Sequence, residues 1–283
     1  MTVERARANP LRKPWGVADL QPWSSANVDG SAVGEIWFER ADKNAQDPSL
    51  LLKLLFTSQP LSIQVHPDDE FAQSIGLPNG KTEAWYVLSA APGAKVALGL
   101  REEVTPPQLR SAVESGKIPG LVSWRPVTAG DTIFVPAGTI HAIGAGLVIA
   151  EIQQRSDATF RMFDYGRERD LHVENAVAVA DTAPAEALAV PKRFSDQRTV
   201  LVSGPYFVFE SIDLPPNSEW SLAAEQETWL LVVKGGGRAG SSNLAIGDAI
   251  FAQADSVEIR AGALGMQALV AYVDKAPAPR LLQ

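Results

Sequence analysis

The stretch EAWYVLSAAPGA, residues 83–94, decides the fold because a similar stretch returns later in the chain, as ETWLLVVKGGGRAG at residues 227–240. A second pair of segments follows in the same order: GDTIFVPAG at residues 130–138 and GDAIFAQAD at residues 247–255. Each copy therefore has the pattern of a strand, a glycine-rich turn and a strand that opens with Gly-Asp. Two related β-domains account for this repeat more simply than one irregular domain.

The rest of the chain also has the pattern of β-structure. Short segments rich in Val, Ile, Leu and aromatic residues alternate with Gly, Pro, Asn and Asp, as in β-barrels and sandwiches. One helix is indicated at TPPQLRSAVESG, residues 105–116, where Thr105 and Gln108 fit a capping box and Gly116 ends the apolar pattern. We therefore predict an all-β protein with a short helical insert at about residues 101–120.

The expected domain boundaries follow from the repeat. Residues 1–180 are expected to form the first barrel, which contains the helical insert, and residues 195–283 the second. The segment between them, residues 181–194, is rich in Ala and Pro and has the composition of a linker. All three histidines of the chain precede this linker. If the protein binds a metal ion, we expect one site, in the first barrel.

Composition disfavours several classes of function. The 283 residues are 46% hydrophobic, enough for a sizeable core, and the formal net charge is -8. This charge disfavours nucleic acid and anionic membrane surfaces as partners and favours a small-molecule substrate. The chain has no cysteine, so any metal would be held by nitrogen and oxygen ligands. Because neither a secretory signal nor a membrane span is evident, we expect a cytoplasmic protein; its oligomeric state is left open.

The first candidate metal ligands lie in SIQVHPDDEF, residues 62–71. Side chains on a strand alternate between its two faces, so Ser62, Gln64 and His66 share one face. This polar trio can line a cavity. A lone histidine on a strand is more often a surface or hydrogen-bonded residue than a ligand, so the hypothesis depends on the residues that join it.

Two further segments complete the candidate metal site. In GKTEAWYVL, Glu83 shares a strand face with Lys81, and in FVPAGTIHAIGAG, His141 follows a Pro-Ala-Gly turn where a strand would re-enter the barrel. With Gln64 and His66 they supply an amide oxygen, two imidazoles and one carboxylate, the makeup of an open catalytic metal site. Zinc suits these ligands, with one ion per chain, although manganese, iron, cobalt and nickel are not excluded by ligand type.

Other polar and aromatic residues have plainer interpretations. His172 has no ligand-like neighbours in the sequence and is expected to be structural. Asp68 and Asp69 most simply end a strand at a turn and stay solvated. Trp85 and Trp229 occupy matching positions of the repeat, which favours packing over stacking on a substrate.

A second functional cluster is indicated by LVIAEIQQRSDATFRMFDYGRERD, residues 147–170. Strand alternation separates Glu151 and Gln153 from their apolar neighbours, so Glu151 can project into the cavity of the metal site. Glu151 is a candidate proton acceptor, and Arg161 on the following segment is a candidate anion clamp. Both residue types are also common on solvated strands, so these roles depend on the metal site.

Taken together, these motifs resemble the type I mannose-6-phosphate isomerases, metal-dependent enzymes of the cupin superfamily. The resemblance is carried, in the family's order, by PLSIQVHPDDEFA, GKTEAWYVL, GDTIFVPAGTIHAIGAG and IAEIQQRSDATFRMFDYGRERDLH. It implies two cupin-type, jelly-roll barrels and a zinc ion with four ligands: Gln64, His66, Glu83 and His141. It also implies residues that act on the substrate: Glu151, Lys81 and Arg161 in catalysis, the last two also in substrate binding, and Ser62 near the substrate phosphate.

The same resemblance implies a reaction. Family members interconvert mannose 6-phosphate and fructose 6-phosphate, which implies a cis-enediol intermediate here with Glu151 as the base. Longer members carry a substantial helical domain, whereas this chain is similar to the short bacterial form. Two alternatives stay open: another cupin activity, such as isomerisation of a different sugar phosphate or an oxygen-using reaction, and a sugar-phosphate-binding protein without catalysis. Activity with zinc and without oxygen, and turnover rather than binding alone, would separate them.

Overall fold

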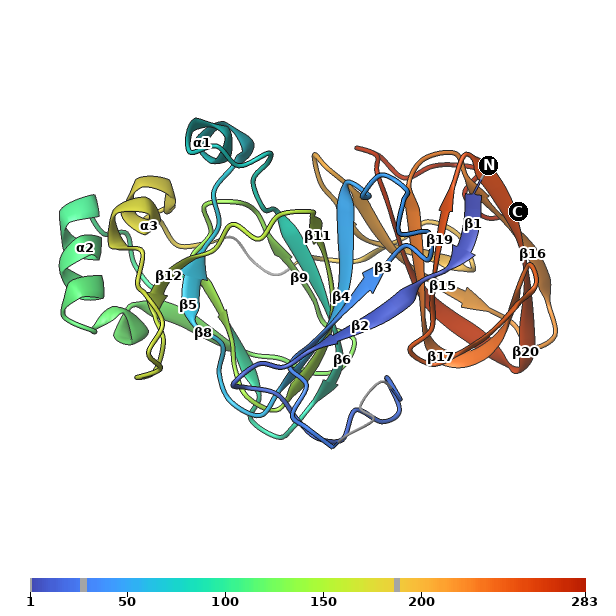
Figure 1. The fold of residues 1–283 in the computed structure, drawn as a ribbon, viewed down its shortest axis with the longest axis horizontal. Helices are drawn as coiled ribbons and strands as arrows, with labels where there is room; N and C mark the ends of the chain where they lie inside the picture. Colours follow the sequence, from blue (N-terminus) through green and yellow to red (C-terminus); the bar gives the residue numbers. More distant parts are fainter. Residues whose placement is uncertain (1, 26–29, 186–188) are drawn as a thin grey trace. The chain divides into compact units, whose positions relative to one another are not determined.

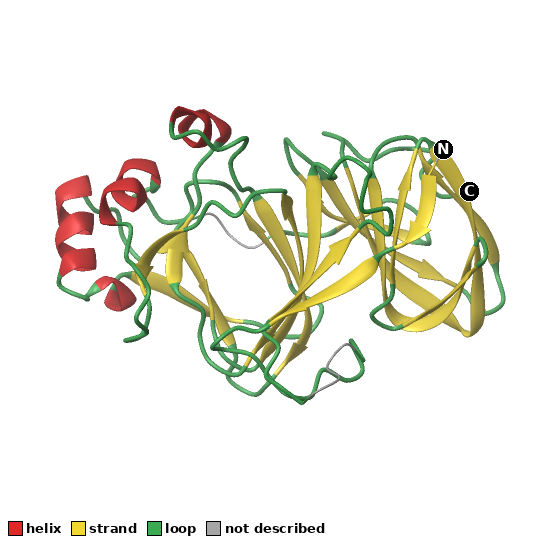
Figure 2. Ribbon diagram, in the orientation of Figure 1, coloured by secondary structure: helices red, strands yellow, loops and turns green. Residues whose placement is uncertain are grey.

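The chain folds mostly into antiparallel β-sheets with a few short helices, as the sequence predicts (Figures 1 and 2). The computed structural model describes residues 2–25, 30–185 and 189–283. Residues 186–188 of the expected linker therefore lie outside the described residues.

The chain divides into two compact units whose ranges differ from the expected domains. The first unit comprises residues 1–12, 18–53 and 189–283, and the second comprises residues 13–17 and 54–188. The early residues group with the carboxyl-terminal part because Thr2–Arg5 pair with a strand near residue 250 and Glu227 accepts hydrogen bonds from the amides of Ser49 and Leu50. The assignment of a metal-binding barrel to 1–180 and a metal-free one to 195–283 stays a prediction.

The second unit contains the motifs of the predicted metal site. Its elements are β5 (Ile63–Val65), α1 (Asp69–Ser74), β6 (Glu83–Ala90), β7 (Lys95–Leu100), α2 (Pro106–Glu114), the 3₁₀ helix η1 (Ile118–Gly120), β8 (Val122–Pro126), β9 (Thr132–Val135), β10 (His141–Ile143), β11 (Leu147–Gln154), β12 (Phe160–Phe163) and α3 (Val173–Val179). Five of these strands form a sheet in the order β12-β5-β10-β7-β8, and β11, β6 and β9 are neighbours in another sheet. Strand pairs in both sheets are antiparallel.

Apolar side chains from the two sheets of the second unit pack into a shared core. Trp85 and Val87 of β6 belong to one buried cluster with Ile143 of β10 and Leu98 of β7. Burial of this cluster supplies the hydrophobic driving force that holds the sheets together. The inner faces of the strands that carry the candidate site residues are therefore closed from water by their own apolar neighbours.

A second buried cluster lies under the helices. Ile63 and Val65 of β5 pack with Leu109 and Val113 of α2 and with Ala176 of α3. Figure 1 shows α2 and α3 side by side next to β5 and β12, in agreement with their contacts. The alternation of β5 thus gives its apolar side chains to this cluster and leaves the opposite face for polar residues.

The predicted helix is confirmed, but two other helices were not predicted. In α2 the side chains of Thr105 and Gln108 form the reciprocal capping box, and Gly116 follows the helix end with a left-handed φ of 69°. Helix α1 is only six residues long, and α3 is rich in valine, which favours strands. Among the helices of the described residues, none has both the length and the apolar character that a membrane crossing requires.

The first unit is built from the remaining strands: β1 (Thr2–Arg5), β2 (Arg7–Leu11), β3 (Glu35–Glu39), β13 (Lys192–Arg193), β14 (Arg198–Ser203), β15 (Val208–Leu214), β16 (Glu219–Ala224), β17 (Thr228–Ala239), β18 (Ser242–Ala245), β19 (Ala249–Gln253) and β20 (Asp255–Tyr272). Strand β4 (Leu50–Thr57) begins in this unit and ends in the second. The main sheet runs β1-β19-β17-β20-β15-β14-β13, with β16 beside β20 and β18 beside β17.

In each unit, the two strands of the sequence repeat pair with each other. β6 pairs with β9 so that Trp85 lies opposite Ile133, and β17 pairs with β19 so that Trp229 lies opposite Phe251. Both tryptophans are fully buried, as expected for packing residues. The repeated strand pairing is confirmed, whereas the closure of each unit into a jelly-roll barrel stays a prediction.

We predict that Thr105→Ala weakens the first turn of α2, because it removes the acceptor of the N-cap. The expected loss is about 1 kcal/mol of local stability. Hydrogen exchange of the α2 amides should then be roughly fivefold faster. Ser111→Ala on the same helix is the matched control, because Ser111 is exposed and α2 should exchange no faster in it. Equal α2 exchange rates in Thr105→Ala and the wild type would contradict the role of the cap.

Candidate metal centre

The register of the five-stranded sheet places three candidate side chains in one row. Gln64 of β5 lies opposite His141 of β10 on one side and opposite Arg161 of β12 on the other. Directly opposed residues in a sheet point to the same face. His66 follows two residues after Gln64 and shares this face.

The other sheet supplies the acidic residues by the same rule. Glu83 of β6 lies opposite Gln153 of β11, and Trp85 lies opposite Glu151. The four side chains therefore form two adjacent rows on one face of the β6–β11 pair. This register places Glu83 and Glu151 at diagonal positions on the same face.

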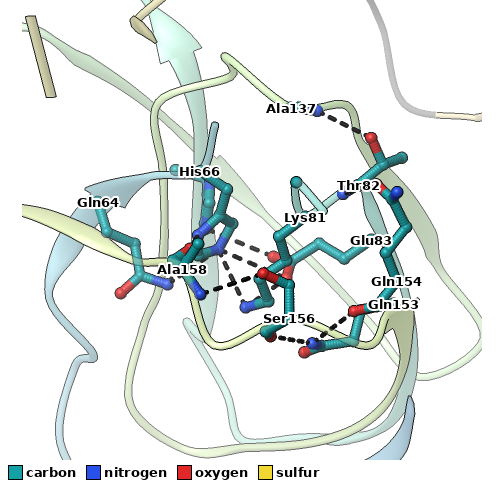
Figure 3. A network of polar contacts seen from close by, with 12 residues as sticks. Gln64, His66, Lys81, Thr82, Glu83, Ala137, Gln153, Gln154, Ser156 and Ala158 are labelled. Atoms are coloured by element: carbon teal, nitrogen blue, oxygen red, sulfur yellow. Dashed lines mark hydrogen bonds and ion pairs between the residues drawn. The ribbon is translucent and has the colours of Figure 1, made fainter. Parts of the chain in front are cut away.

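Three ligand-type side chains from the two sheets meet at one point. The Nε2 atom of His66 lies 3.5 Å from Oε2 of Glu83, and the Nε2 atom of His141 lies 3.4 Å from Oε1 of Glu83. All three side chains are 1% exposed, and their ligand atoms lie within 4.8 Å of one another. Figure 3 shows His66 and Glu83 directed toward each other.

Backbone carbonyls fix the tautomer of both histidines. The Nδ1 atom of His66 lies 2.7 Å from the carbonyl oxygen of Ala158, and Nδ1 of His141 lies 2.8 Å from that of Thr139. Because a carbonyl oxygen only accepts, we assign the ring proton of each histidine to Nδ1. Each Nε2 then directs a lone pair toward Glu83, as in metal sites where the second ring nitrogen is held by a carbonyl.

Burial keeps the imidazole of His141 neutral. Burial is the main cause that lowers the pKa of His141 to about 4, and the charge of Lys81 lowers this pKa further. The hydrogen bond to Thr139 and the charge of Glu151 oppose the shift. A neutral imidazole is the form that binds a metal ion.

The cluster fits a divalent cation in both chemistry and spacing. Two lone pairs and a carboxylate directed at one another repel unless positive charge lies among them. A tetrahedral ion with bonds of about 2.1 Å would hold its ligand atoms roughly 3.4 Å apart. Nε2 of His66 and Nε2 of His141 lie 3.5 Å and 3.4 Å from the two different oxygens of the Glu83 carboxylate, which is close to this spacing. His66, Glu83 and His141 could therefore hold a metal ion.

Gln64 lies at the same point, but its amide is oriented differently from the expectation of an oxygen ligand. Its Nε2 atom lies 3.3 Å from Nε2 of His141 and 3.5 Å from Nε2 of His66, while its Oε1 atom accepts a hydrogen bond from Ser62 at 2.8 Å. A half-turn of the amide exchanges the two ends, and the Ser62 hydroxyl can accept as well as donate. The position of Gln64 thus suits a ligand once the amide is turned.

Lys81 provides positive charge beside the carboxylate. Its Nζ atom lies 2.9 Å from Oε2 of Glu83 and 3.1 Å from Nε2 of His66 (Figure 3). Lys81 is itself buried. An ammonium group among these acceptors offsets part of the cost of burying Glu83.

The other expected site residues lie around this cluster. Glu151 is 4% exposed and close enough to influence the charge of His141. Arg161 is half-buried, and its Nε atom donates to the carbonyl oxygen of Asp170 at 3.1 Å. Burial is the largest cause that lowers the pKa of Arg161, followed by the charge of Arg169. Nδ1 of His172 accepts a hydrogen bond from the Arg161 amide at 3.1 Å, and its structural role stays a prediction.

The interpretation of the two aspartates was incomplete. Asp68 is exposed, as expected, but its side chain caps α1 by accepting from the amide of Phe71 at 2.8 Å. Asp69 was expected to stay solvated, and this is wrong. It is half-buried, and its Oδ1 atom accepts hydrogen bonds from the Gly80 amide and the Gln154 side chain. Asp68 followed by the acidic residues Asp69 and Glu70 is a sequence signal for the start of a helix. The hydrogen bonds of Asp69 have no such signal in the sequence.

Solved structures share this fold. The crystal structure of mannose 6-phosphate isomerase from Bacillus subtilis is similar, with a TM-score of 0.83 and 24% identity, covering 96% of this chain and all of that one. No family model matches the chain. The observations so far define an all-β protein with the fold of this isomerase structure and with a buried His–Glu–His cluster that could hold a metal ion.

Sequence relatives narrow the class to a family. The putative mannose-6-phosphate isomerase YvyI of Bacillus subtilis is 33% identical over 226 residues, which cover 74% of this chain and 70% of the relative. The mannose-6-phosphate isomerase of Streptococcus mutans is 43% identical over 167 residues, 56% of this chain. The chain therefore belongs to the mannose-6-phosphate isomerase family, in the short bacterial form of type I. The matched region spans about half of the Streptococcus relative, 52%.

We predict that Glu83→Ala and His141→Ala each abolish binding of a divalent ion, because each removes a strong ligand. Metal analysis after dialysis should give about one ion per wild-type chain and close to none in either variant. Glu70→Ala is the matched control, because Glu70 is an exposed carboxylate on α1, and it should retain the ion. Full metal occupancy of the double variant would refute the ligand assignment.

Proposed function

We propose that this chain is a metal-dependent aldose–ketose isomerase that interconverts mannose 6-phosphate and fructose 6-phosphate. The observation that carries the proposal is the buried cluster of His66, Glu83 and His141, with Lys81 against it, in a chain of the mannose-6-phosphate isomerase family. The names of the relatives support this choice of substrate. A small sugar phosphate also agrees with the acidic net charge, which disfavours polyanionic partners.

We expect one zinc ion per chain, held by four residues: Gln64, His66, Glu83 and His141. Other divalent metals suit the same ligands. When bound, the ion would supply positive charge that stabilises an oxyanion on the sugar. With a single carboxylate among the proposed ligands, the site keeps a net positive charge.

Glu151 is the residue that we propose as the base. Isomerisation requires a proton to move between C2 and C1 of the open-chain sugar through a cis-enediol. A buried carboxylate on the same face as Glu83 is suited to accept this proton and return it to the neighbouring carbon. Glu151 lies diagonal to Glu83, so it is next to the proposed metal site without being one of the four proposed ligands.

The cationic residues would stabilise and orient the substrate. Arg161 shares its row with Gln64, and it keeps a positive charge even with a lowered pKa. Lys81 lies against Glu83 and can polarise a sugar oxygen. Ser62, which donates to Gln64, is the residue that we assign to the neighbourhood of the phosphate. Fixed positive groups of this kind stabilise the charge that develops on the enediol oxygens.

The function is tested by metal analysis of the purified chain, followed by a coupled assay with mannose 6-phosphate as substrate. We expect bound metal and formation of fructose 6-phosphate under anaerobic conditions. Binding of the sugar phosphate without turnover would instead identify a binding protein. Turnover of a different sugar phosphate alone would move the proposal to another cupin isomerase.

We predict that Glu151→Gln keeps its metal and its fold but loses turnover by roughly 100-fold to 10,000-fold, because it removes the proton acceptor. Incorporation of solvent deuterium into the sugar should fall by the same factor. The matched control is Glu102→Gln, an exposed residue before α2, which should keep wild-type turnover. Wild-type turnover in Glu151→Gln would exclude Glu151 as the base.

A further inference from the structure

The segment that leads into Glu83 is held by every one of its backbone amides. Residues 80–82 immediately precede Glu83 and include Lys81. Their three successive N–H groups each donate a hydrogen bond: Gly80 to Oδ1 of Asp69 at 2.8 Å, Lys81 to the carbonyl oxygen of Pro67 at 2.9 Å, and Thr82 to Oε1 of Gln154 at 2.9 Å. Two of the three acceptors are side chains, so the path of this segment depends on residue identity.

The two side-chain acceptors are bonded to each other. The side-chain Nε2 of Gln154 donates to Oδ1 of Asp69 at 3.0 Å, and the backbone N–H of Gln154 donates to the carbonyl oxygen of Thr82 at 3.0 Å. Gln154 is buried, whereas Asp69 lies in the first turn of α1. A glutamine is suited to this place because its amide accepts with one end and donates with the other. We call Asp69 and Gln154 the clamp pair.

The segment of residues 80–82, which the clamp pair binds, packs closely against the residues that follow His66. A Cβ atom on Gly80 would lie 2.4 Å from the carbonyl carbon of Asp68 and 2.5 Å from the carbonyl oxygen of Pro67. No side chain fits in this gap. The approach therefore fixes the distance between the segment that carries Glu83 and the strand end that carries His66.

A third segment is tied to the same point. The Oγ1 atom of Thr82 accepts from the Ala137 amide at 3.2 Å, and the Gly138 amide donates to the carbonyl oxygen of His66 at 2.8 Å. The segment from Ala137 to Gly138 leads into β10 and His141. Figure 3 shows Thr82 between Ala137 and Gln154, next to Lys81 and Glu83.

We propose that Asp69 and Gln154 are positioning residues that set Lys81 and Glu83 against His66 and thereby determine metal affinity. The proposal rests on the proposed function in one respect, the role of Glu83 as a ligand. Neither member of the clamp pair belongs to the His66–Glu83–His141 cluster or to an apolar core cluster. Their effect on the site is therefore exerted through the amides of Gly80 and Thr82.

Loss of the clamp should weaken metal binding more than it weakens the fold. Groups that orient metal ligands from behind typically change metal affinity by about 10-fold to 100-fold when they are removed. Gln154→Met keeps the side-chain volume but removes both hydrogen bonds of the amide. Asp69→Leu removes the shared acceptor, whereas Asp69→Asn keeps an oxygen for both donors and serves as its conservative partner.

The test measures Zn²⁺ and Co²⁺ dissociation constants, the Co²⁺ absorption spectrum and the near-ultraviolet circular dichroism of each full-length variant. We expect Gln154→Met and Asp69→Leu to bind both ions about 10-fold to 100-fold more weakly, with an altered Co²⁺ spectrum and an unchanged fold. Asp69→Asn should restore wild-type affinity. The double variant should be no weaker than the weaker single variant, because the pair acts as one unit.

The matched control is Gln73→Met, the same substitution at an exposed position on α1, which should bind as the wild type does. Wild-type affinity and spectrum in both Gln154→Met and Asp69→Leu would overturn the proposal. If Gln154→Met does not fold, the comparison of Asp69→Leu with Asp69→Asn decides by itself. If the wild-type chain binds neither ion, the proposed function and the clamp proposal are both overturned. If the wild type binds the ions and the variants bind them equally well, only the clamp proposal is overturned, so the two failures are distinguishable.

Discussion

The burial of the Glu83 carboxylate is the constraint on which the second unit depends. A carboxylate removed from water costs several kcal/mol of free energy unless charged or hydrogen-bonding groups surround it. Here the ammonium of Lys81 and the imidazoles of His66 and His141 lie within 3.5 Å of its oxygens. Because these groups come from two sheets, one buried charge fixes how closely the inner faces of the sheets approach. Two imidazole lone pairs and a carboxylate are a ligand set that suits a divalent cation.

The repeat shows that the same strand pair can bury a carboxylate in two ways. Glu227, at the position that corresponds to Glu83, accepts hydrogen bonds from the amides of Ser49 and Leu50 and from Nε1 of Trp229. Burial is the main cause that raises the pKa of Glu227, and these hydrogen bonds oppose the shift. Its oxygens are thus engaged by two backbone amides and the Trp229 side chain, whereas Glu83 faces side chains that could bind a metal ion. The two carboxylates therefore differ in their environment, although they hold the same place in the repeat.

Strand β5 connects the core to the site. Ile63 and Val65 pack against the helices, and Gln64 between them lies in a row with His141 and Arg161. A shift of one residue in this three-residue strand would turn Gln64 into the apolar cluster and an apolar side chain toward the site. Hydrophobic burial on one face therefore fixes the chemistry on the other. Strand register alone does not set the distance between the segment that carries Glu83 and the strand end that carries His66. The hydrogen bonds around the clamp pair set this distance.

The sequence by itself determined the β-architecture, the capping box of α2 and the face on which each candidate ligand lies. These properties depend on strand alternation and on neighbours within a few residues, so a linear pattern is sufficient. Only the tertiary structure decided that residues 18–53 group with the carboxyl-terminal part, that Ala158 and Thr139 hold the histidine rings, and that Asp69 binds the segment before Glu83. Apart from the Thr139 contact, which spans two residues, these contacts join residues 11 or more positions apart in the chain. Many of them use backbone carbonyls and amides, which carry no signal in the residue type. Strand alternation predicts the face to which a side chain points, but only the packing of the sheets determines which residues it contacts there.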